Sequence, residues 1–406
     1  MKTSLEGIKV LDLSRVLAGP WAGQLLGDYG ADVVKIERPG QGDDTRCWGP
    51  PWLGSESAYF LSTNRNKRSV AVDISTPRGQ QVIRDLAREA DVLLENFRVG
   101  TLARYGLDAE ELMAVNPGLI VCSISAFGQS GSRASEPGYD AMIQASAGLM
   151  SITGATDEDG GGPQKVGVAV ADLMAGMYAA TAVLAALHAR ASSGRGQLID
   201  VPLYDSQVAW LANQNMNYLV GGSVPERMGT AHPNLVPYQA FRTADGNLML
   251  AVGNDRQFAA CMACVGCPEI ADNEAYANND ARVRNRERLV PIIQEQLLRN
   301  TTAHWLDAFA AHAVPAGPIN DIGEVLGNDH ARERGLVRHI ENGAGDAVPS
   351  VSNPVSFSAT PVTYDRAPPL LGEHTGEVLQ EWLGYSDELI EDLSSASAIQ
   401  VISAAL

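Results

Sequence analysis

Short apolar strand segments alternate with helical segments over the first 125 residues, and this alternation most restricts the possible folds. Strand patterns cover residues 8–13, 33–36, 69–74, 91–95 and 119–124, with helical patterns at 20–29, 76–90 and 107–115 between them. Successive strands that are joined through helices pair in parallel, and the helices then cover both faces of the sheet. The pattern therefore predicts an α/β fold with a Rossmann-like, doubly wound large domain.

The strand and helix pattern continues to about residue 220, and the sequence then changes character. Two strand patterns at 238–242 and 248–252 flank Asp245-Gly246, which is a hairpin turn signal. Helical patterns follow at 258–265, 282–298 and 304–312. We therefore predict three parts: a large domain over 1–220, a small α+β domain over 225–325, and a C-terminal segment, 326–406, that returns to the large domain.

Composition excludes several classes of partner. The 406-residue chain carries a formal net charge of -18, whereas a nucleic-acid-binding protein needs a basic face. The longest apolar run follows Asp172 and is shorter than the roughly 20 residues that cross a bilayer. The first seven residues lack the basic start and apolar centre of a signal peptide. These features predict a cytoplasmic protein that binds neither nucleic acid nor membrane.

Two cofactor patterns are present only in part. Glu37 ends the second strand, where a ribose-binding acid would lie, but the glycines at 19, 23 and 27 are spaced by four and do not form G-x-G-x-x-G. Cys261, Cys264 and Cys267 are spaced by three in an apolar context that lacks an evident fourth ligand. We therefore predict no dinucleotide, no metal site and no permanently bound cofactor, and we interpret the cysteines as helix-face thiols.

Asp172 is the single charged residue at the start of a long apolar helical pattern, 173–187. At a helix start, free backbone N–H groups and the helix dipole favour the ionised carboxylate, so we expect Asp172 to be charged at neutral pH. Two interpretations are open from this stretch alone. Asp172 either caps the helix or acts as a carboxylate nucleophile.

Basic residues gather near the ends of the early strands, although the chain is acidic overall. They are Arg38, Arg46, Arg65, Lys67, Arg68, Arg98 and Arg104. Open α/β sheets bind ligands at the carboxyl ends of their strands, and arginine binds phosphate through two hydrogen bonds. Together these residues favour a phosphorylated ligand over a set of unrelated surface charges.

A series of motifs in fixed order gives the chain a specific resemblance. They are Arg15-Val-Leu-Ala-Gly-Pro20, Gly30-Ala-Asp-Val-Val-Lys-Ile-Glu-Arg-Pro-Gly40, Gly42-Asp-Asp-Thr-Arg46, Asn64-Arg-Asn-Lys-Arg-Ser69, Glu95-Asn96-Phe97, Pro137-Gly-Tyr-Asp140, Ala171-Asp172, Gly194-Arg-Gly-Gln197 and Leu370-Leu-Gly-Glu-His-Thr375. Over nearly its whole length the chain resembles the class III CoA-transferases. Further blocks around Trp48, His232 and Gly253 resemble the branch that uses succinyl-CoA with glutarate or a similar dicarboxylate.

The resemblance implies an interlocked homodimer and an enzyme that moves CoA from an acyl-CoA donor to a carboxylic acid acceptor. The nucleophilic aspartate falls on Asp172, which would form first an anhydride and then a CoA thioester. The implied CoA contacts fall on Val16, Arg38, Val72, Asn96, Phe97, Arg98, Arg104 and Tyr139. We consider Arg46, His232 and Arg256 candidates for binding the second carboxylate of the acceptor, or the sulfinate of an analogue. Backbone N–H groups near the start of the Asp172 helix, or in the turn at Gly253 and Asn254, are candidates for oxyanion stabilisation.

Two alternatives to CoA transfer are a racemase and a non-catalytic CoA-binding protein. The related α-methylacyl-CoA racemases use a histidine in a Gly-His-Asp motif, and here that triplet is Gly138-Tyr139-Asp140. The racemases exchange an α-proton with a histidine and an aspartate, and this chain lacks that histidine. A non-catalytic CoA-binding protein is the other alternative, and the presence of Asp172 argues against it.

Overall fold

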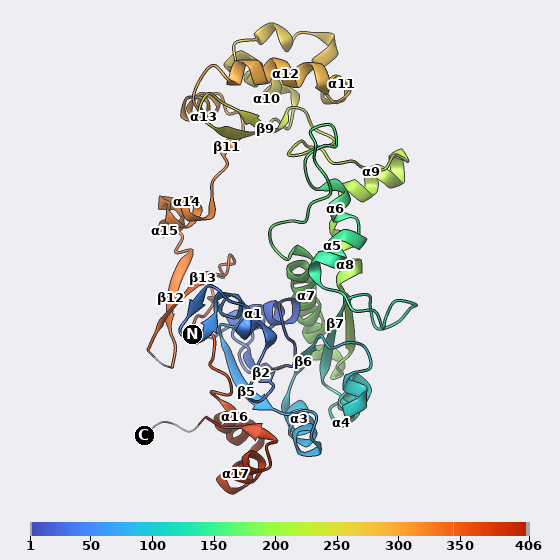
Figure 1. Ribbon diagram of the computed structural model, residues 1–406, viewed down its shortest axis with the longest axis vertical. Coiled ribbons are helices and arrows are strands. Elements are labelled where there is room, and N and C mark those ends of the chain that lie inside the picture. Colours follow the sequence, from blue (N-terminus) through green and yellow to red (C-terminus); the bar gives the residue numbers. More distant parts are fainter. Residues whose placement is uncertain (1, 344, 403–406) are drawn as a thin grey trace. The chain divides into compact units, whose positions relative to one another are not determined.

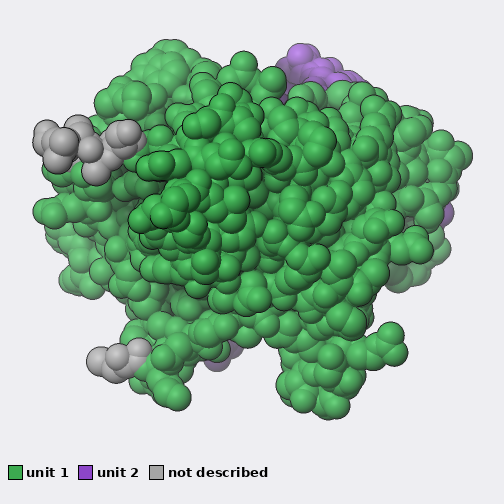
Figure 2. All heavy atoms as spheres, turned by 90° about the horizontal axis from the view of Figure 1, so that it is seen from below, with its two compact units in different colours: residues 1–149, 166–221, 329–406 green, residues 150–165, 222–328 purple. Residues whose placement is uncertain are grey.

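The computed structural model describes residues 2–343 and 345–402, which form two compact units (Figure 1, Figure 2). Unit 1 takes the described residues up to 149, then 166–221, and those from 329 onward. Unit 2 consists of residues 150–165 and 222–328. Residues 150–165 thus group with unit 2, although they lie inside the range that we expected for the large domain.

Unit 1 is built on a seven-stranded sheet in which all strands but one run parallel. The strands are β1 (Lys9–Asp12), β2 (Asp32–Glu37), β5 (Lys67–Val72), β6 (Val92–Glu95), β7 (Ile120–Ser125), β8 (Leu198–Pro202) and β14 (Ile399–Gln400). Their order is β14-β5-β2-β1-β6-β7-β8, and β14 pairs antiparallel with β5. The mixed α/β class and the large parallel sheet that the sequence predicted are confirmed.

The strand order reverses between β1 and β6, which lie side by side in the centre of the sheet. From β1 the chain proceeds outward through β2 and β5, and it then returns to start the other half at β6. The loops that leave the carboxyl ends of β1 and β6 therefore turn to opposite faces. A crevice for a ligand opens at such a reversal.

Helices cover both faces of this sheet because successive strand residues point to opposite sides. In β1, Leu11 packs into one apolar core and Val10 into the other. The first core includes side chains of α3 (Pro77–Glu89), α4 (Ala109–Val115), α16 (Thr375–Leu383) and α17 (Asp387–Ser395). The second includes side chains of α1 (Ala18–Asp28), α5 (Asp140–Ser146), α7 (Val170–Ser193) and α8 (Leu203–Trp210).

Shorter elements complete unit 1. They are η1 (Asp44–Cys47), β3 (Trp52–Leu53), β4 (Glu56–Ser57), α2 (Ala58–Leu61), η2 (Leu102–Tyr105), α6 (Leu149–Ile152, which continues into unit 2), α9 (Asn213–Gly221), α15 (Asp329–Glu333), β12 (Val337–Glu341) and β13 (Ala347–Val351). η1 follows β2 and η2 follows β6, so both lie at the carboxyl side of the sheet.

Unit 2 has its own antiparallel sheet and its own apolar core. Its elements are β9 (Tyr238–Arg242), β10 (Asn247–Ala251), α10 (Asp255–Cys264), η3 (Pro268–Ile270), η4 (Glu274–Tyr276), α11 (Asn279–Arg284), α12 (Arg286–Leu297), α13 (Thr302–Ala311), β11 (Ala316–Pro318) and α14 (Ile322–Gly327). The helix expected over 282–298 is divided at Asn285, whose side-chain amide donates to the Ala281 and Ala275 carbonyls.

Four basic residues of the predicted ligand cluster, Arg46, Arg65, Lys67 and Arg68, are instead paired with acids inside the fold, which corrects that part of the prediction. Lys67 begins β5, where it pairs with Asp12 at 3.0 Å, and Arg68 pairs with Asp32 at 2.5 Å. Arg65 binds both carboxylate oxygens of Asp28, at 2.8 and 2.6 Å. Burial lowers the pKa of Lys67 to about 8, although the Asp12 charge opposes this. The sequence shows these basic residues, but it does not show which acidic residues they pair with in the fold.

One described helix, α7, is long and apolar enough to cross a bilayer by length and composition alone. Helices in the cores of soluble proteins pass the same test, and the side chains of α7 contribute to the second core of unit 1. Gly176 lies against α1 so closely that an added Cβ would come within 2.6 Å of the Ala18 carbonyl oxygen. This close packing of α7 on α1 accounts for the small residues in its apolar sequence.

The Arg65–Asp28 pair predicts a measurable difference between buried and exposed ion pairs. Arg65→Met leaves the fully buried Asp28 carboxylate without its bidentate partner, and we expect it to lower the free energy of unfolding by about 3 kcal/mol. Arg78→Met, which removes an exposed pair with Asp392, should cost about 1 kcal/mol or less. Urea denaturation followed by circular dichroism measures both. Equal losses would contradict the assignment of Arg65 to the fold.

Candidate functional site

Asp172 lies in the first turn of α7, which begins two residues earlier at Val170. The helix start is preceded by Ala169, whose methyl side chain offers no oxygen to the first amides. Those amides find other acceptors: the Leu173 N–H donates to the Ala169 carbonyl, and the Ala171 N–H donates to Asp140 Oδ1 at 2.8 Å. Asp140 therefore takes an amide that we expected to serve Asp172.

The surroundings of Asp172 therefore differ from those that we expected for a carboxylate at a helix start. Burial raises the pKa of its carboxyl, and the negative charge of Asp140 raises it further, to about 7. The Ala171 amide at the helix start is already hydrogen-bonded to Asp140, so it does not offset the desolvation of Asp172.

Asp140 and Gln144, both on α5, hold the segment that leads into α7. The Gln144 side-chain amide donates to Asp140 Oδ2 at 2.7 Å, and its oxygen accepts from the Val166 N–H at 2.9 Å. Together with the Ala171 contact, these bonds attach both ends of the 166–171 segment to one helix. They fix where Asp172 enters its helix.

A cavity of about 240 Å³ in unit 1, which we call the Asp172 cavity, contains the carboxylate. The loops after β1 and β6 line it, as the strand reversal predicts. Its walls include Arg15, Val16, Leu17, Asn96, Phe97, Arg98, Tyr139 and Asp172. Ile124, Ala126 and Leu203 add apolar surface.

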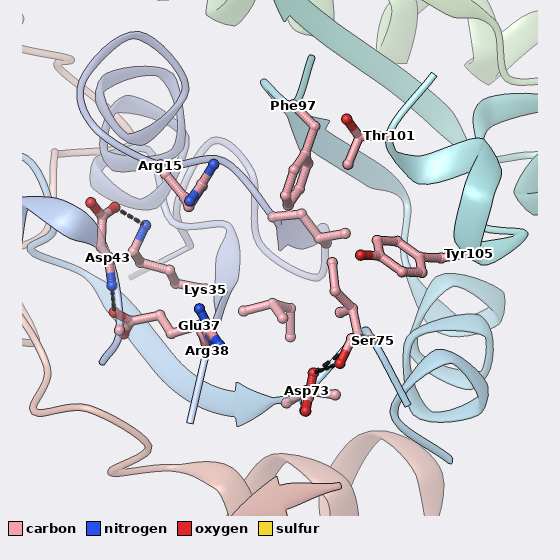
Figure 3. A pocket seen from close by; sticks show the side chains of 15 residues that line it. Arg15, Lys35, Glu37, Arg38, Asp43, Asp73, Ser75, Phe97, Thr101 and Tyr105 are labelled. Carbon is pink, nitrogen blue, oxygen red and sulfur yellow. Dashed lines mark hydrogen bonds and ion pairs between the residues drawn. The ribbon is translucent and has the colours of Figure 1, made fainter. Parts of the chain in front are cut away.

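A second cavity of about 390 Å³, the strand-end cavity, lies beyond the carboxyl ends of β1, β2, β5 and β6 (Figure 3). Residues that line it include Arg15, Arg38, Val72, Ser75, Phe97, Thr101 and Tyr105. Arg15 and Phe97 line both cavities, and the Arg15 guanidinium lies 5.3 Å from the centre of the Phe97 ring. The two cavities are therefore neighbours that share this pair of side chains.

The structure brings most of the residues predicted to contact CoA to these two cavities. Arg38, Val72 and Phe97 line the strand-end cavity, while Val16, Asn96, Phe97, Arg98 and Tyr139 line the Asp172 cavity. Arg104 is exposed on η2, between the cavity-lining residues Thr101 and Tyr105.

Two residues at this site were missed by sequence reasoning. Arg15 follows β1 by three residues, and the strand-end argument that selected Arg38 would also have selected Arg15. Tyr59, on α2, is affected by the charge of Asp172: burial first, and then Asp172, raise the pKa of its phenol to about 12. Nothing in the local sequence of Tyr59 indicates this neighbour.

The candidates for a second carboxylate lie in different surroundings. Arg46 is buried and forms ion pairs with Glu37 at 2.7 Å and with Glu56 at 2.8 Å, so its charge is already neutralised. His232, in unit 2, accepts a hydrogen bond from the Asn234 N–H at 3.0 Å, and its ring lies 5.2 Å from that of Tyr238. Burial, and then Arg286, lower the pKa of His232. Arg256 is exposed on α10 of unit 2.

The turn proposed for oxyanion stabilisation also belongs to unit 2. The Gly253 N–H donates to the Gln257 side chain at 2.8 Å, and the Asn254 side chain caps α10 by accepting from the Gln257 N–H at 2.9 Å. Both groups therefore already have partners within unit 2.

Comparison with known proteins gives the family. The family model described as "CoA-transferase family III" matches residues 5–375. The chain belongs to CoA-transferase family III. A succinate–glutarate CoA-transferase of Agrobacterium fabrum is 50% identical over 386 residues, which cover 94% of this chain and 96% of that protein. The human succinyl-CoA:glutarate CoA-transferase is 44% identical over 395 residues, 97% of this chain and 90% of that protein.

Solved structures agree with this membership. The crystal structure of a CAIB/BAIF family protein from Brucella suis superposes with a TM-score of 0.82 at 44% identity. It covers 94% of this chain, and all of that chain is matched. As a family III CoA-transferase, the chain is an enzyme whose class uses CoA thioesters and carboxylic acids as substrates.

The surroundings of Asp172 predict an unusual titration. In the infrared difference spectrum between the wild type and Asp172→Asn, the ionised carboxylate band should appear with a midpoint near pH 7. Asp140→Asn removes the like charge, so the midpoint should fall. Asp307→Asn, on an exposed face of α13, serves as the control for band assignment. A wild-type midpoint near pH 4 would contradict the electrostatic account.

Proposed function

We propose that the protein transfers CoA from succinyl-CoA to glutarate, with Asp172 as the covalent carrier. One observation carries the proposal: Asp172 lies in a cavity that shares two wall residues with the cavity at the strand ends. A long ligand with a phosphorylated head and a reactive thioester end fits such a pair of sites. The named substrates of the relatives from Agrobacterium fabrum and human support the choice of acids.

In this proposal the nucleotide part of CoA binds in the strand-end cavity. Arg38 and Arg104 would pair with phosphates, while Val72 and Phe97 contact the base. Asn96, Arg98, Val16 and Tyr139 would line the path of the pantetheine arm toward Asp172. The exposed Arg38 and Arg98 supply local positive charge, which a protein of net charge -18 needs at an anion site.

The first half of the reaction moves CoA onto the enzyme. An ionised Asp172 oxygen attacks the thioester carbonyl of succinyl-CoA, and the C–S bond breaks. CoA thiolate is released, and a mixed anhydride between Asp172 and succinate forms. The thiolate then attacks the Asp172 carbonyl carbon, the anhydride C–O bond breaks, and succinate departs. Asp172 is left as a CoA thioester, which conserves the energy of the original bond.

The second half repeats these steps with the acceptor. A glutarate carboxylate attacks the aspartyl thioester, CoA thiolate leaves, and a second anhydride forms. Attack of the thiolate on the glutaryl carbonyl gives glutaryl-CoA and regenerates the Asp172 carboxylate. Protons balance without an added acid or base. The apolar walls at Ile124, Ala126 and Leu203 suit intermediates that water would hydrolyse.

The second carboxylate of the acceptor needs a partner that is not already paired within the fold. Arg46 is paired with the buried Glu37 and the partly buried Glu56, so we do not propose it as a partner of this carboxylate. His232 and Arg256 remain our candidates for binding it. The Gly253 and Asn254 turn stays a prediction from the sequence, because its groups already have partners within unit 2. We place the enzyme in the cytoplasm, since its proposed substrates are water-soluble anions and α7 packs against α1.

The proposed function predicts a clear loss of activity on removal of one carboxylate. Asp172→Ala should reduce the formation of glutaryl-CoA from succinyl-CoA and glutarate by at least about 10⁴-fold, because no acyl carrier remains. Binding of CoA to this variant, measured by calorimetry, should stay within a few-fold of the wild type. Asp307→Ala, which changes an exposed helix residue, is the matched control. Full activity of Asp172→Ala would refute the proposal.

We also propose that the protein is an interlocked homodimer, as the family resemblance implies. The residues of α9 are all at least partly exposed in the single chain, and Leu219 and Val220 are 71% and 79% exposed. Met177 and Tyr178 on α7 and Trp210 on α8 add apolar surface. A second copy of the chain is a partner that would cover such a surface.

Charge placed on α9 tests this assembly. Leu219→Glu combined with Val220→Glu should shift the sedimenting species from twice the chain mass to the chain mass, or lower its solubility. Glu391→Lys, an exposed charge change on α17, should leave the dimer intact. A wild-type protein that sediments as a monomer at micromolar concentration would contradict the dimer.

A further inference from the structure

Val16, in the wall of the Asp172 cavity, has a backbone conformation that valine rarely adopts. Its φ is +71°, in the left-handed region, where the branched Cβ crowds the backbone. Such a residue persists only when its surroundings hold it there. Val16 is also the residue that carries the chain from β1 into α1, so its conformation determines where Arg15 and Leu17 enter the cavity wall.

Side chains bind the backbone on both sides of Val16. The Val16 N–H points at the Asp43 carboxylate, 3.2 Å from each oxygen. Asn96 accepts from the Arg15 N–H at 2.8 Å and donates to the Arg15 carbonyl at 2.6 Å. Lys35 donates to the Ser14 carbonyl at 2.9 Å. Residues 14–16 are therefore held by three side chains from the two neighbouring strand regions.

Asp43 is itself fixed in one orientation. It is 1% exposed, pairs with the fully buried Lys35 at 2.8 Å, and accepts from the Thr45 N–H and hydroxyl at 3.0 and 2.8 Å. Figure 3 shows Asp43 and Lys35 at the edge of the strand-end cavity, joined by a dashed line. A buried ion pair contributes little net stability, so a role other than stabilisation fits the Asp43–Lys35 pair better.

We propose that Asp43 is a positioning residue for the transfer reaction: it holds Val16 in the left-handed conformation and so shapes the wall that faces Asp172. This inference rests on the proposed function of Asp172. Asp43 acts through the backbone of residues 15–17, while Lys35 keeps its carboxylate charged and oriented. Lys35 and Asp43 also line the strand-end cavity. The same ion pair would therefore position both the proposed CoA site and the wall of the Asp172 cavity.

A double-mutant cycle between Asp43 and Val16 tests the inference. Glycine adopts a positive φ without a Cβ penalty. In a Val16→Gly background, the conformation of position 16 should therefore depend less on the hydrogen bond to Asp43. We expect Asp43→Asn to lower kcat for CoA transfer about tenfold or more in the wild-type background. In the Val16→Gly background the same change should lower kcat about threefold or less, with Val16→Gly alone as the reference.

Asp91→Asn provides the matched control, since Asp91 is a carboxylate at the opposite ends of the strands that accepts from the Lys9 N–H and pairs with Arg190. Its effect on kcat should be the same factor in both backgrounds. Asp43→Asn should also speed hydrogen exchange in the peptide that spans residues 13–20, because the Val16 amide loses a charged acceptor. If Asp43→Asn does not fold, Lys35→Met combined with Asp43→Leu removes the pair without leaving a buried charge.

The outcomes separate this inference from the function on which it rests. Equal losses from Asp43→Asn in both backgrounds, with the activity still dependent on Asp172, would overturn the positioning role alone. Activity that persists in Asp172→Ala would overturn the proposed function, and the cycle would then have no reacting carboxylate to position. A loss that Val16→Gly reverses supports the inference, because a purely stabilising role of Asp43 would not depend on the residue at position 16.

Discussion

The reversal of strand order between β1 and β6 is the constraint on which the site depends. Parallel strands place all their carboxyl ends at one edge of the sheet, and the reversal separates the two central loops there. The loop after β1 supplies Arg15 and Val16, and the loop after β6 supplies Asn96 and Phe97. The two cavities of unit 1 form on these loops, and α7 brings Asp172 to one of them from the flanking layer.

Buried charge gives the site its chemical character. No described residue forms an ion pair with Asp172, and burial, followed by the charge of Asp140, raises the pKa of its carboxyl to about 7. A carboxylate that is poorly stabilised in its ionised form gains more from forming an acyl bond than a well-solvated one. Close by, Asp43 has the opposite setting: burial alone would raise its pKa, but Lys35 and Thr45 lower it to about 2. The two carboxyl groups thus have pKa values that are shifted in opposite directions.

The sequence predicted the parts of this arrangement that depend on local pattern. Alternating strands and helices gave the α/β class, and strand ends gave Arg38 and Arg98. Ordered motifs gave the family and indicated Asp172. The raised pKa of Asp172 was not predictable, because it depends on the burial of the carboxyl in the folded chain and on Asp140, which is distant in sequence and takes the Ala171 amide. Lys67 and Arg65 were misjudged for the same reason, since each is matched by an acid on another element.

The central claim is that Asp172 itself carries the acyl group and then CoA. Hydroxylamine added during turnover of succinyl-CoA and glutarate intercepts an activated carboxyl and converts it to a hydroxamate, which mass spectrometry locates in the digested protein. The account predicts a hydroxamate on Asp172 that forms only when succinyl-CoA is present and disappears in Asp172→Ala. An unmodified Asp172 under conditions of active transfer, or a hydroxamate on another residue, would contradict it.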